Sequence, residues 1–306
     1  MRSVGAGAMA CSGVMRRDAL EVAIVHHRTP TLLAQALERL AAVAPDVPVR
    51  VVDSAFDASL PRQLDGIHPL LQWTPVVNHS YAFAVNSAVR LARRPLLAQM
   101  NADVLIEQGT LPALAAAFED PRVAAAGPLA RTPSGRLQDQ GLPYRAHHAR
   151  LRWASRATGR AAAVTVPWLS GCLQVLRLEA LRGVGGFDTR LRFYNEDLEW
   201  CLRARRGGWR CVLVDAEVLH VGGASTQRRT DLALEGLRGG YAVSARHAPA
   251  WLRPLHRWGL AGAAYAVSLR TSDVAERRRW RGLARRAAGD ELATACFGPV
   301  LDEPLC

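Results

Sequence analysis

The 306-residue sequence contains no lysine, so all 39 of its basic side chains are arginines. Against 27 acidic residues they leave a formal net charge of +12 at pH 7. An excess of this size favours anionic partners such as phosphates, anionic lipid headgroups or nucleic acid. The charge alone does not distinguish among these partners.

Cysteine is also scarce, and its six copies are scattered along the chain. Because they form neither a CxxC pair nor a Cys/His cluster with zinc spacing, the sequence argues against a structural zinc site. We expect free thiols in a reducing compartment, and therefore a cytoplasmic protein.

Long apolar runs are absent as well, since none reaches the roughly 18 residues that suggest a membrane span. Residues 1–17 are small, polar and glycine-rich, and they lack the continuous apolar core of a secretory signal. We expect residues 1–20 to be a disordered extension, unless translation begins at Met15.

Strand and helix patterns alternate through the first half of the chain. Residues 21–27 form an apolar run rich in β-branched side chains, typical of a buried strand. Residues 31–44 have apolar side chains at helical spacing, and residues 49–52 form a second buried strand. This order predicts an α/β domain with a parallel sheet. Further strands are expected at 71–77, 95–100, 123–126 and 209–221, and helices at 78–93, 111–118, 178–181 and 198–206.

The pattern changes in the second half. Residues 131–160 are polar, arginine-rich and irregular, whereas residues 164–176 are apolar. Beyond residue 226 the sequence is mostly helical and basic, with tryptophans interleaved among arginines. This basic region is either a solvated helix face over core tryptophans or an attachment surface for an anionic membrane.

Two aspartates directly follow predicted strands. Asp53 comes after the strand at 49–52, and Asp103 comes after the strand at 95–100, preceded by Asn101. Ligands gather at the carboxyl ends of parallel strands, where a carboxylate can bind Mg²⁺ or Mn²⁺ together with phosphate oxygens. Taken singly, each aspartate is more commonly a turn or helix-capping residue.

A second pair of acids, Glu196 and Asp197, lies at the head of the helix predicted at 198–206. A helix N-terminus stabilises negative charge, so capping is the simplest interpretation, and a general base is the functional one. Because two adjacent acids cannot both face one ligand, we favour Asp197 as the base and Glu196 as a supporting residue. His220 ends the strand at 209–221 and is either a packing residue or, beside Asp103, a metal or phosphate ligand.

Longer motifs surround these residues. GGFD at 185–188 is followed by YNEDLEWCLR at 194–203, and WLSGC, HVGGAS and NHSYAFAVN begin at 168, 220 and 78. Together they resemble the inverting family-2 glycosyltransferases of the GT-A fold, particularly the rhamnosyltransferase-like bacterial members, over roughly residues 21–226. Ser80 and Ala102 stand where the family pattern has a glycine and a proline.

The resemblance implies a Rossmann-like, mixed but mostly parallel sheet flanked by helices. The catalytic domain would have a nucleotide-binding half at 21–127 and an acceptor-binding half at 128–226, followed by a basic helical C-terminal region at 227–306. It also implies metal-dependent, inverting transfer from a nucleotide-diphosphate sugar to a hydroxyl of a glycan or lipid-linked acceptor.

The resemblance assigns roles to individual residues. Asp197 and Glu196 would be catalytic, and Asp103 and His220 would bind a Mg²⁺ or Mn²⁺ ion. The residues expected to bind the donor are Thr29, Asp53, Asn78, Asn86, Asn101, Trp168 and Gly171.

Three other functions compete with this one. A non-catalytic nucleotide-sugar-binding protein has the same fold, and a nucleic-acid-binding protein is supported by charge alone because no such motif is present. A nucleotidyltransferase usually needs a glycine- and basic-rich phosphate loop near the first strand, which HHRTP at 26–30 is not. We therefore expect no nucleic acid partner, and peripheral contact with the anionic inner face of the cell membrane. The resemblance favours a deoxythymidine-diphosphate rhamnose donor, with a uridine-diphosphate sugar as the alternative.

Overall fold

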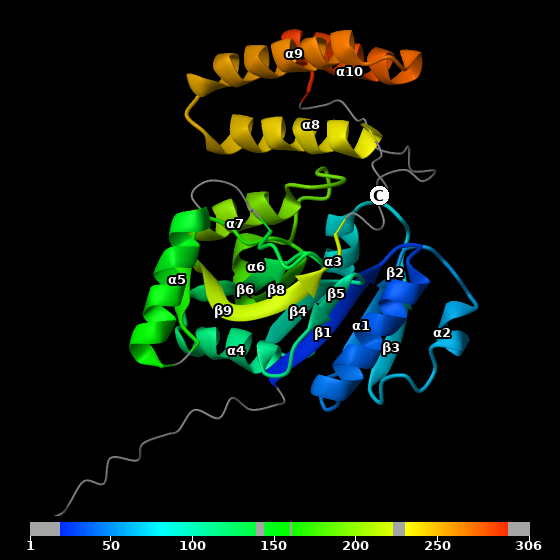
Figure 1. The fold of residues 1–306 in the computed structure, drawn as a ribbon, viewed down its shortest axis with the longest axis vertical. Coiled ribbons are helices and arrows are strands. Elements are labelled where there is room, and N and C mark those ends of the chain that lie inside the picture. Colours follow the sequence, from blue (N-terminus) through cyan, green and yellow to red (C-terminus); the bar gives the residue numbers. More distant parts are fainter. Residues whose placement is uncertain (1–18, 139–143, 160, 223–229, 293–306) are drawn as a thin grey trace, which may run out of the picture.

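The computed structural model describes residues 19–138, 144–159, 161–222 and 230–292. The extension expected at 1–20 therefore lies almost wholly outside the described residues, as does the HVGGAS motif from residue 223 onward. A nine-stranded mixed sheet is flanked by helices, and three further helices follow it, which confirms the predicted fold class (Figure 1).

The sheet combines a parallel block with antiparallel neighbours. The order is β3 (Leu71–Pro75), β2 (Val49–Asp53), β1 (Leu20–His26), β4 (Leu96–Asn101), β8 (Leu173–Arg177), β6 (Val123–Arg131), β9 (Arg210–His220) and β5 (Val104–Ile106), with β7 (Ala163–Val166) paired to β9. β3, β2, β1 and β4 run parallel, so their carboxyl ends share one edge of the sheet. β8 is antiparallel to both β4 and β6.

Successive side chains of the strands point to opposite faces of the sheet and pack into two separate hydrophobic cores. Along β1, Val22 and Ile24 enter one core and Ala23 enters the other. The first face is covered by α1 (Pro30–Val43), α2 (Leu60–Gln63) and α4 (Thr110–Ala116), which continues into a 3₁₀ turn at Ala117–Glu119. The second face is covered by α3 (Tyr81–Leu91), α6 (Leu178–Val184) and α7 (Glu196–Arg206).

The C-terminal helices α8 (Thr230–His247), α9 (Leu252–Arg270) and α10 (Val274–Ala288) have a small core of their own, to which Tyr241, Ala264 and Leu283 contribute. They stack on the side of the sheet domain that carries α7, with α8 nearest to it (Figure 1). Across the described residues, no helix is long and apolar enough to cross a membrane.

The interpretation of residues 131–160 as irregular was wrong. β6 extends to Arg131, and α5 (Tyr144–Thr158) is a helix of 15 residues. Among the α5 side chains that the structure describes, only Leu151 is buried, and the helix is polar and arginine-rich overall, which is why the sequence led us to expect irregular structure. Its many alanines and arginines, which are good helix formers, account for the helix.

Two other elements differ from the sequence prediction. The apolar stretch at 164–176 is two strands, β7 and β8, separated by a loop at residues 167–172. The three-residue β5 was not predicted, because a strand this short leaves no periodicity to detect.

Ser80 explains where α3 begins. The helix starts at Tyr81 instead of residue 78, and the Ser80 hydroxyl accepts a hydrogen bond from the Phe83 N–H at 3.0 Å. Ser80 has a φ of −166°, an extended conformation that any residue can adopt. The glycine of the family pattern is therefore not required by this backbone, and serine adds a helix cap.

Removing this cap should destabilise the protein measurably. We expect Ser80→Ala to lower the free energy of unfolding by about 1 kcal/mol, because the Phe83 N–H loses its acceptor. In a domain of this size that corresponds to a fall in Tm of about 2–4 °C. Scanning calorimetry measures the change, with Ser80→Thr, which keeps the hydroxyl, as the control. Equal Tm values for the alanine and threonine variants would contradict the capping role.

Candidate active site

The backbone of Gly171 joins three elements at the carboxyl end of β4. Its N–H donates a hydrogen bond to Asp197 Oδ2 at 2.7 Å, which connects it to the first turn of α7. Its carbonyl oxygen accepts from Gln99 Nε2 of β4 at 2.8 Å and lies 3.1 Å from the Tyr81 hydroxyl of α3. A Cβ atom here would lie 3.3 Å from Asp197 Oδ2, so glycine allows the close approach.

The Tyr81 hydroxyl connects this peptide to Asn101. It lies 2.6 Å from Gln99 Oε1 and 2.7 Å from Asn101 Oδ1. A phenol has one proton, so it donates to one of these oxygens at a time. Burial, and next the negative charge of Glu196, hold the pKa of Tyr81 well above its usual range, so this hydroxyl stays protonated.

Asp103 and His220 meet at the point where β5 pairs with β9. Asp103 Oδ1 lies 3.3 Å from His220 Nε2, and Asp103 Oδ2 accepts from the Gly222 N–H at 3.1 Å. The other ring nitrogen, Nδ1, donates to Gln138 Oε1 at 2.8 Å. Burial lowers the pKa of His220, but hydrogen bonds to Asp103 and Cys172 outweigh burial and raise the pKa to about 10.

The acids at 103 and 197, which are 94 positions apart in the sequence, thus approach one region of the structure. The Tyr81 hydroxyl is close enough to both for their charges to raise its pKa. The peptide that holds Asp197 also leads directly into Cys172, whose thiol contacts His220. This juxtaposition is the spatial relationship that the predicted site requires.

Glu196 and Asp197 lie in different surroundings although they are adjacent. Asp197 is half-buried, and its two oxygens accept from the N–H groups of Gly171 and Leu198, each at 2.7 Å. Glu196 is buried, and its Oε2 has no hydrogen-bond partner among the residues that the structure describes. Burial, and next the charge of Asp197, raise the pKa of Glu196 to about 8. Burial also raises the pKa of Asp197, against the opposing effect of its two N–H donors. At neutral pH Glu196 therefore keeps its proton, and the negative charge of the pair rests on Asp197.

Asp53 ends β2 and is fixed by the neighbouring strand. Its Oδ1 accepts from His26 Nδ1 and from the Ala55 N–H, both at 2.9 Å. His26 Nε2 accepts from the Thr29 N–H at 3.0 Å, which defines a neutral imidazole with its proton on Nδ1. The loop after β1 is thereby tied to Asp53, and Asp53 Oδ2 has no partner among the described residues.

The other predicted donor-binding residues are less closely gathered. Asn86 makes two hydrogen bonds to the backbone of Phe187, at 2.8 and 2.9 Å, and so connects α3 to the loop before α7. Asn78 is exposed in the loop before α3, and Trp168 is half-buried against the second core. Their roles in donor binding stay predictions.

Several residues that shape the site were not predicted. Gln99 lies among the apolar residues 96–100 of β4, and a buried polar side chain of this kind is a signal that could have identified it. Tyr81 is part of a quoted motif but was not singled out. Gln138 lies 82 positions from His220, and no local pattern points to their contact.

Asp103 and His220 have the chemistry of a divalent-cation site. A carboxylate oxygen and an imidazole nitrogen face each other, and Gln138 orients the ring as outer hydrogen-bond partners of metal-binding histidines do. No group of three or more His, Cys, Asp or Glu side chains suited to a metal occurs among the described residues. Asp103 and His220 would leave the other coordination positions of such an ion for phosphate oxygens and water.

Comparison with known proteins identifies the family. A family model described as Glycosyl transferase family group 2 matches residues 97–298, a range that includes Asp103, Gly171, Asp197 and His220. The chain belongs to this glycosyltransferase family.

The relatives extend the comparison. The chain is 35% identical over 182 residues to N-acetylglucosaminyl-diphospho-decaprenol L-rhamnosyltransferase from two strains of Mycobacterium tuberculosis. The match covers 53% of this chain and 59% of the relative, so the chain spans about three-fifths of that protein's length.

Solved structures show the fold. Mannosyltransferase PcManGT from Pyrobaculum calidifontis, in complex with GDP-Man and Mn²⁺, superposes with a TM-score of 0.59 at 21% identity, covering 91% of this chain and 88% of that one. GalNAc-T7 with UDP, GalNAc and Mn²⁺ gives a TM-score of 0.61 at 14% identity, covering 87% and 55%. The glycosyltransferase fold expected from the motifs is thus confirmed as GT-A.

The raised pKa of Glu196 makes a pH-dependent contribution to stability. The unfolded chain releases the Glu196 proton near pH 4.5, whereas the folded protein keeps it until about pH 8. Between these two values the folded state binds the extra proton, so the free energy of unfolding falls as the pH rises. We expect Glu196→Gln to remove that loss, so its Tm should gain on the wild type between pH 5 and 8.5 and then level off. For a domain of this size, about 2–4 °C corresponds to each kcal/mol. A Tm difference that stays constant over this range would show that Glu196 is ionised in the folded protein.

Proposed function

We propose that the chain is a metal-dependent, inverting glycosyltransferase that moves a hexosyl or deoxyhexosyl group from a nucleotide-diphosphate sugar to an acceptor hydroxyl. The observation that carries this proposal is the arrangement around Gly171. Its N–H binds the carboxylate of Asp197, and its carbonyl oxygen accepts from Gln99 and lies beside the Tyr81 hydroxyl, which contacts Asn101, two residues before Asp103. A candidate base and a pair of candidate metal-binding groups, brought close together from separate elements, are what a single displacement requires.

Asp197 is the proposed general base. Its two N–H donors fix the carboxylate plane, and each oxygen has a second lone pair to accept the proton of an acceptor hydroxyl. Its raised pKa makes it a stronger base than an exposed aspartate. Glu196 supports it by staying protonated, which avoids a second negative charge beside the attacking oxygen. The acceptor oxygen then attacks the anomeric carbon from the face opposite the leaving diphosphate, which inverts the configuration.

Asp103 and His220 are the proposed holders of a Mg²⁺ or Mn²⁺ ion. When bound, such an ion neutralises charge on the departing diphosphate. Asn101 lies beside them for the donor, and Gln138 keeps the His220 ring in place. His220 must release its proton to bind the ion, since only a neutral imidazole nitrogen is a ligand. Asp53, through its remaining oxygen, and Thr29 are the proposed contacts to the nucleoside.

The substrate proposal follows the relatives. The mycobacterial relative is named as a rhamnosyltransferase acting on a decaprenol-linked diphosphosugar, which supports a deoxyhexose donor and a lipid-linked acceptor in polysaccharide or cell-wall biosynthesis. A uridine-diphosphate sugar is the alternative donor. A lipid-linked acceptor also implies work at the cytoplasmic face of the cell membrane, through peripheral contact with its anionic surface.

Replacing the base should separate chemistry from binding. We expect Asp197→Asn to lower the transfer rate by about two to four orders of magnitude, the usual value of a positioned base, with donor affinity nearly unchanged. Product release from candidate nucleotide sugars measures the rate, and titration calorimetry measures the affinity. Asp65→Asn, a change to an exposed acid outside the site, is the control and should behave like the wild type. Near-normal turnover by Asp197→Asn would overturn the assignment.

Replacing the metal-binding carboxylate should have the opposite signature. We expect Asp103→Ala to abolish the Mn²⁺-dependent part of donor binding while leaving the fold intact. A thermal-shift screen of nucleotide sugars with and without Mn²⁺ reads this out, because a ligand that binds the native state raises the Tm. The same screen on the wild type identifies the donor. An Asp103→Ala protein that gains the same Mn²⁺-dependent Tm increase as the wild type would exclude this metal site.

A further inference from the structure

The outer face of α9 carries an apolar stripe that no other part of the described chain covers. The side chains of Trp251, Leu255, Trp258, Tyr265 and Leu269 are 68%, 65%, 56%, 52% and 63% exposed. Their spacing of four, three, seven and four residues places them on one side of a helix. The opposite side packs inward through Ala261, Ala264 and Ser268.

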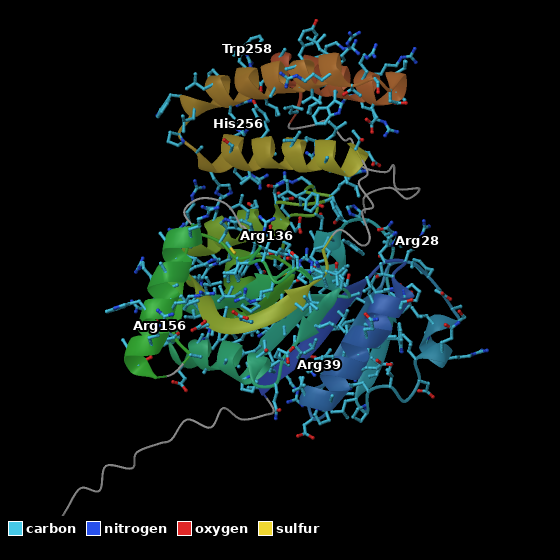
Figure 2. The ribbon with its side chains drawn as sticks, in the orientation of Figure 1. Arg28, Arg39, Arg136, Arg156, His256 and Trp258 are labelled. Atoms are coloured by element: carbon cyan, nitrogen blue, oxygen red, sulfur yellow. The ribbon has the colours of Figure 1, made fainter. Side chains whose placement is uncertain are left out.

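The stripe is a concentrated patch. Of thirteen exposed large hydrophobic side chains among the described residues, seven lie between positions 251 and 274. Figure 2 shows Trp258 on the side of α9 away from α8, whereas His256 points towards α8, where its ring lies 5.4 Å from that of Tyr241. Contiguous apolar surface of this kind marks an interaction site, since single exposed apolar residues are usually scattered.

Positive charge surrounds the stripe. Residues 251–288 contain nine arginines and two acids, Asp273 and Glu276, which gives 9 − 2 = +7. α9 itself contains no acidic residue. On α10, Arg278, Arg281 and Arg285 are exposed at spacings of three and four, opposite the buried Leu283 and Ala287, and none has an ion-pair partner among the described residues. Figure 1 shows α9 and α10 side by side in the layer farthest from the sheet.

Aromatic and aliphatic side chains flanked by arginines match the boundary between lipid headgroups and acyl chains. Tryptophan and tyrosine concentrate at that depth, and arginines reach outward to the phosphates. α9 is not long and apolar enough to cross a bilayer, so it would lie along the membrane surface. A second copy on the same stripe would bring two faces of +7 together, and a nucleic acid would leave the aliphatic stripe uncovered.

We propose that the apolar stripe of α9 and the exposed arginines of α10 form a docking surface for an anionic lipid bilayer. The proposal rests on the proposed function only in that a lipid-linked acceptor gives such docking a purpose. Docking by this layer also sets the orientation of the enzyme. α8 separates the membrane from the sheet domain, and α8 contacts the loop before Glu196 and Asp197, because the Asn195 side chain donates to the Gly236 carbonyl at 2.8 Å. The site therefore lies at the end of the domain that faces the bilayer.

Vesicle flotation with the full chain tests the proposal. We use phosphatidylcholine vesicles with and without phosphatidylglycerol, which contain neither donor nor acceptor, so the result does not depend on the proposed chemistry. We expect flotation with the anionic vesicles, weakened by salt, and little with neutral ones. Trp258→Ser should weaken vesicle binding about tenfold or more, because a large apolar side chain no longer enters the interface.

Helix α5 provides matched controls. Trp153 is 73% exposed there, so Trp153→Ser removes an equally exposed tryptophan from another surface and should bind vesicles like the wild type. Arg278→Glu/Arg281→Glu should abolish binding to anionic vesicles, and Arg150→Glu/Arg156→Glu on α5 should not. Both pairs change exposed arginines, and Tm values verify that each variant is folded.

Three results would overturn the proposal. The first is a wild-type protein that does not float with anionic vesicles, and the second is equal loss of binding in the α5 and α9 tryptophan variants. The third is a wild-type dimer that Trp258→Ser converts to a monomer, with vesicle binding unchanged, which would assign the stripe to a second copy. Donor-induced Tm shifts, measured in parallel without vesicles, report on the proposed function separately.

Discussion

The hydrogen bond from the Gly171 N–H to Asp197 Oδ2 joins the sheet to α7, and the geometry of the site depends on it. The Gly171 carbonyl oxygen accepts a hydrogen bond from Gln99 of β4 and lies 3.1 Å from the Tyr81 hydroxyl of α3. A carboxylate positioned by a rigid backbone does not have to be ordered again when substrate arrives. A Cβ at position 171 would lie 3.3 Å from Asp197 Oδ2 and would push the carboxylate by a few tenths of an ångström, so glycine serves the close contact here and not the backbone angles.

The two residues that precede α7 have a strained backbone, and contacts with α8 stabilise it. Tyr194 and Asn195 both have φ values near +66 to +69°, a conformation that costs roughly 1–2 kcal/mol for each non-glycine residue. Gly236 and Gly239 of α8 allow close packing, because a Cβ on either would lie 3.0 Å from the side chain of Tyr194 or Asn195. The buried Glu199 of α7 accepts hydrogen bonds from Arg246 and His247 at the other end of α8. The division of the chain at residue 227 stays a prediction. α8 nevertheless packs against the segment that carries Glu196 and Asp197. The family match also extends through these helices to residue 298.

The features that could be predicted are those with local signals. Asp53 is the last residue of β2 and Asp103 follows the end of β4 by two residues, and the ends of both strands were predicted to within about two residues from the pattern of side chains. The contact between Gly171 and Asp197 spans 26 residues, and that between Gln138 and His220 spans 82. Contacts between residues so far apart in the sequence produce no local pattern from which they could be predicted. α5 was not predicted because it is polar and arginine-rich overall, with Leu151 as its one buried side chain among those described. The different protonation of Glu196 and Asp197 also depends on burial, which two adjacent acids in a sequence do not reveal.

Electrostatics give a reason why such a site would need a cation. A nucleotide diphosphate is itself anionic, yet the edge of the sheet proposed to bind the donor carries Asp53, Asp103 and Asp197 in an otherwise basic protein. Three features reduce this repulsion: Glu196 holds a proton, Asp53 accepts from the neutral His26, and Asp103 faces His220. The exposed Arg28, on the loop after β1, adds a positive charge near the edge (Figure 2). A divalent ion held by Asp103 and His220 would supply the remaining charge compensation for the diphosphate.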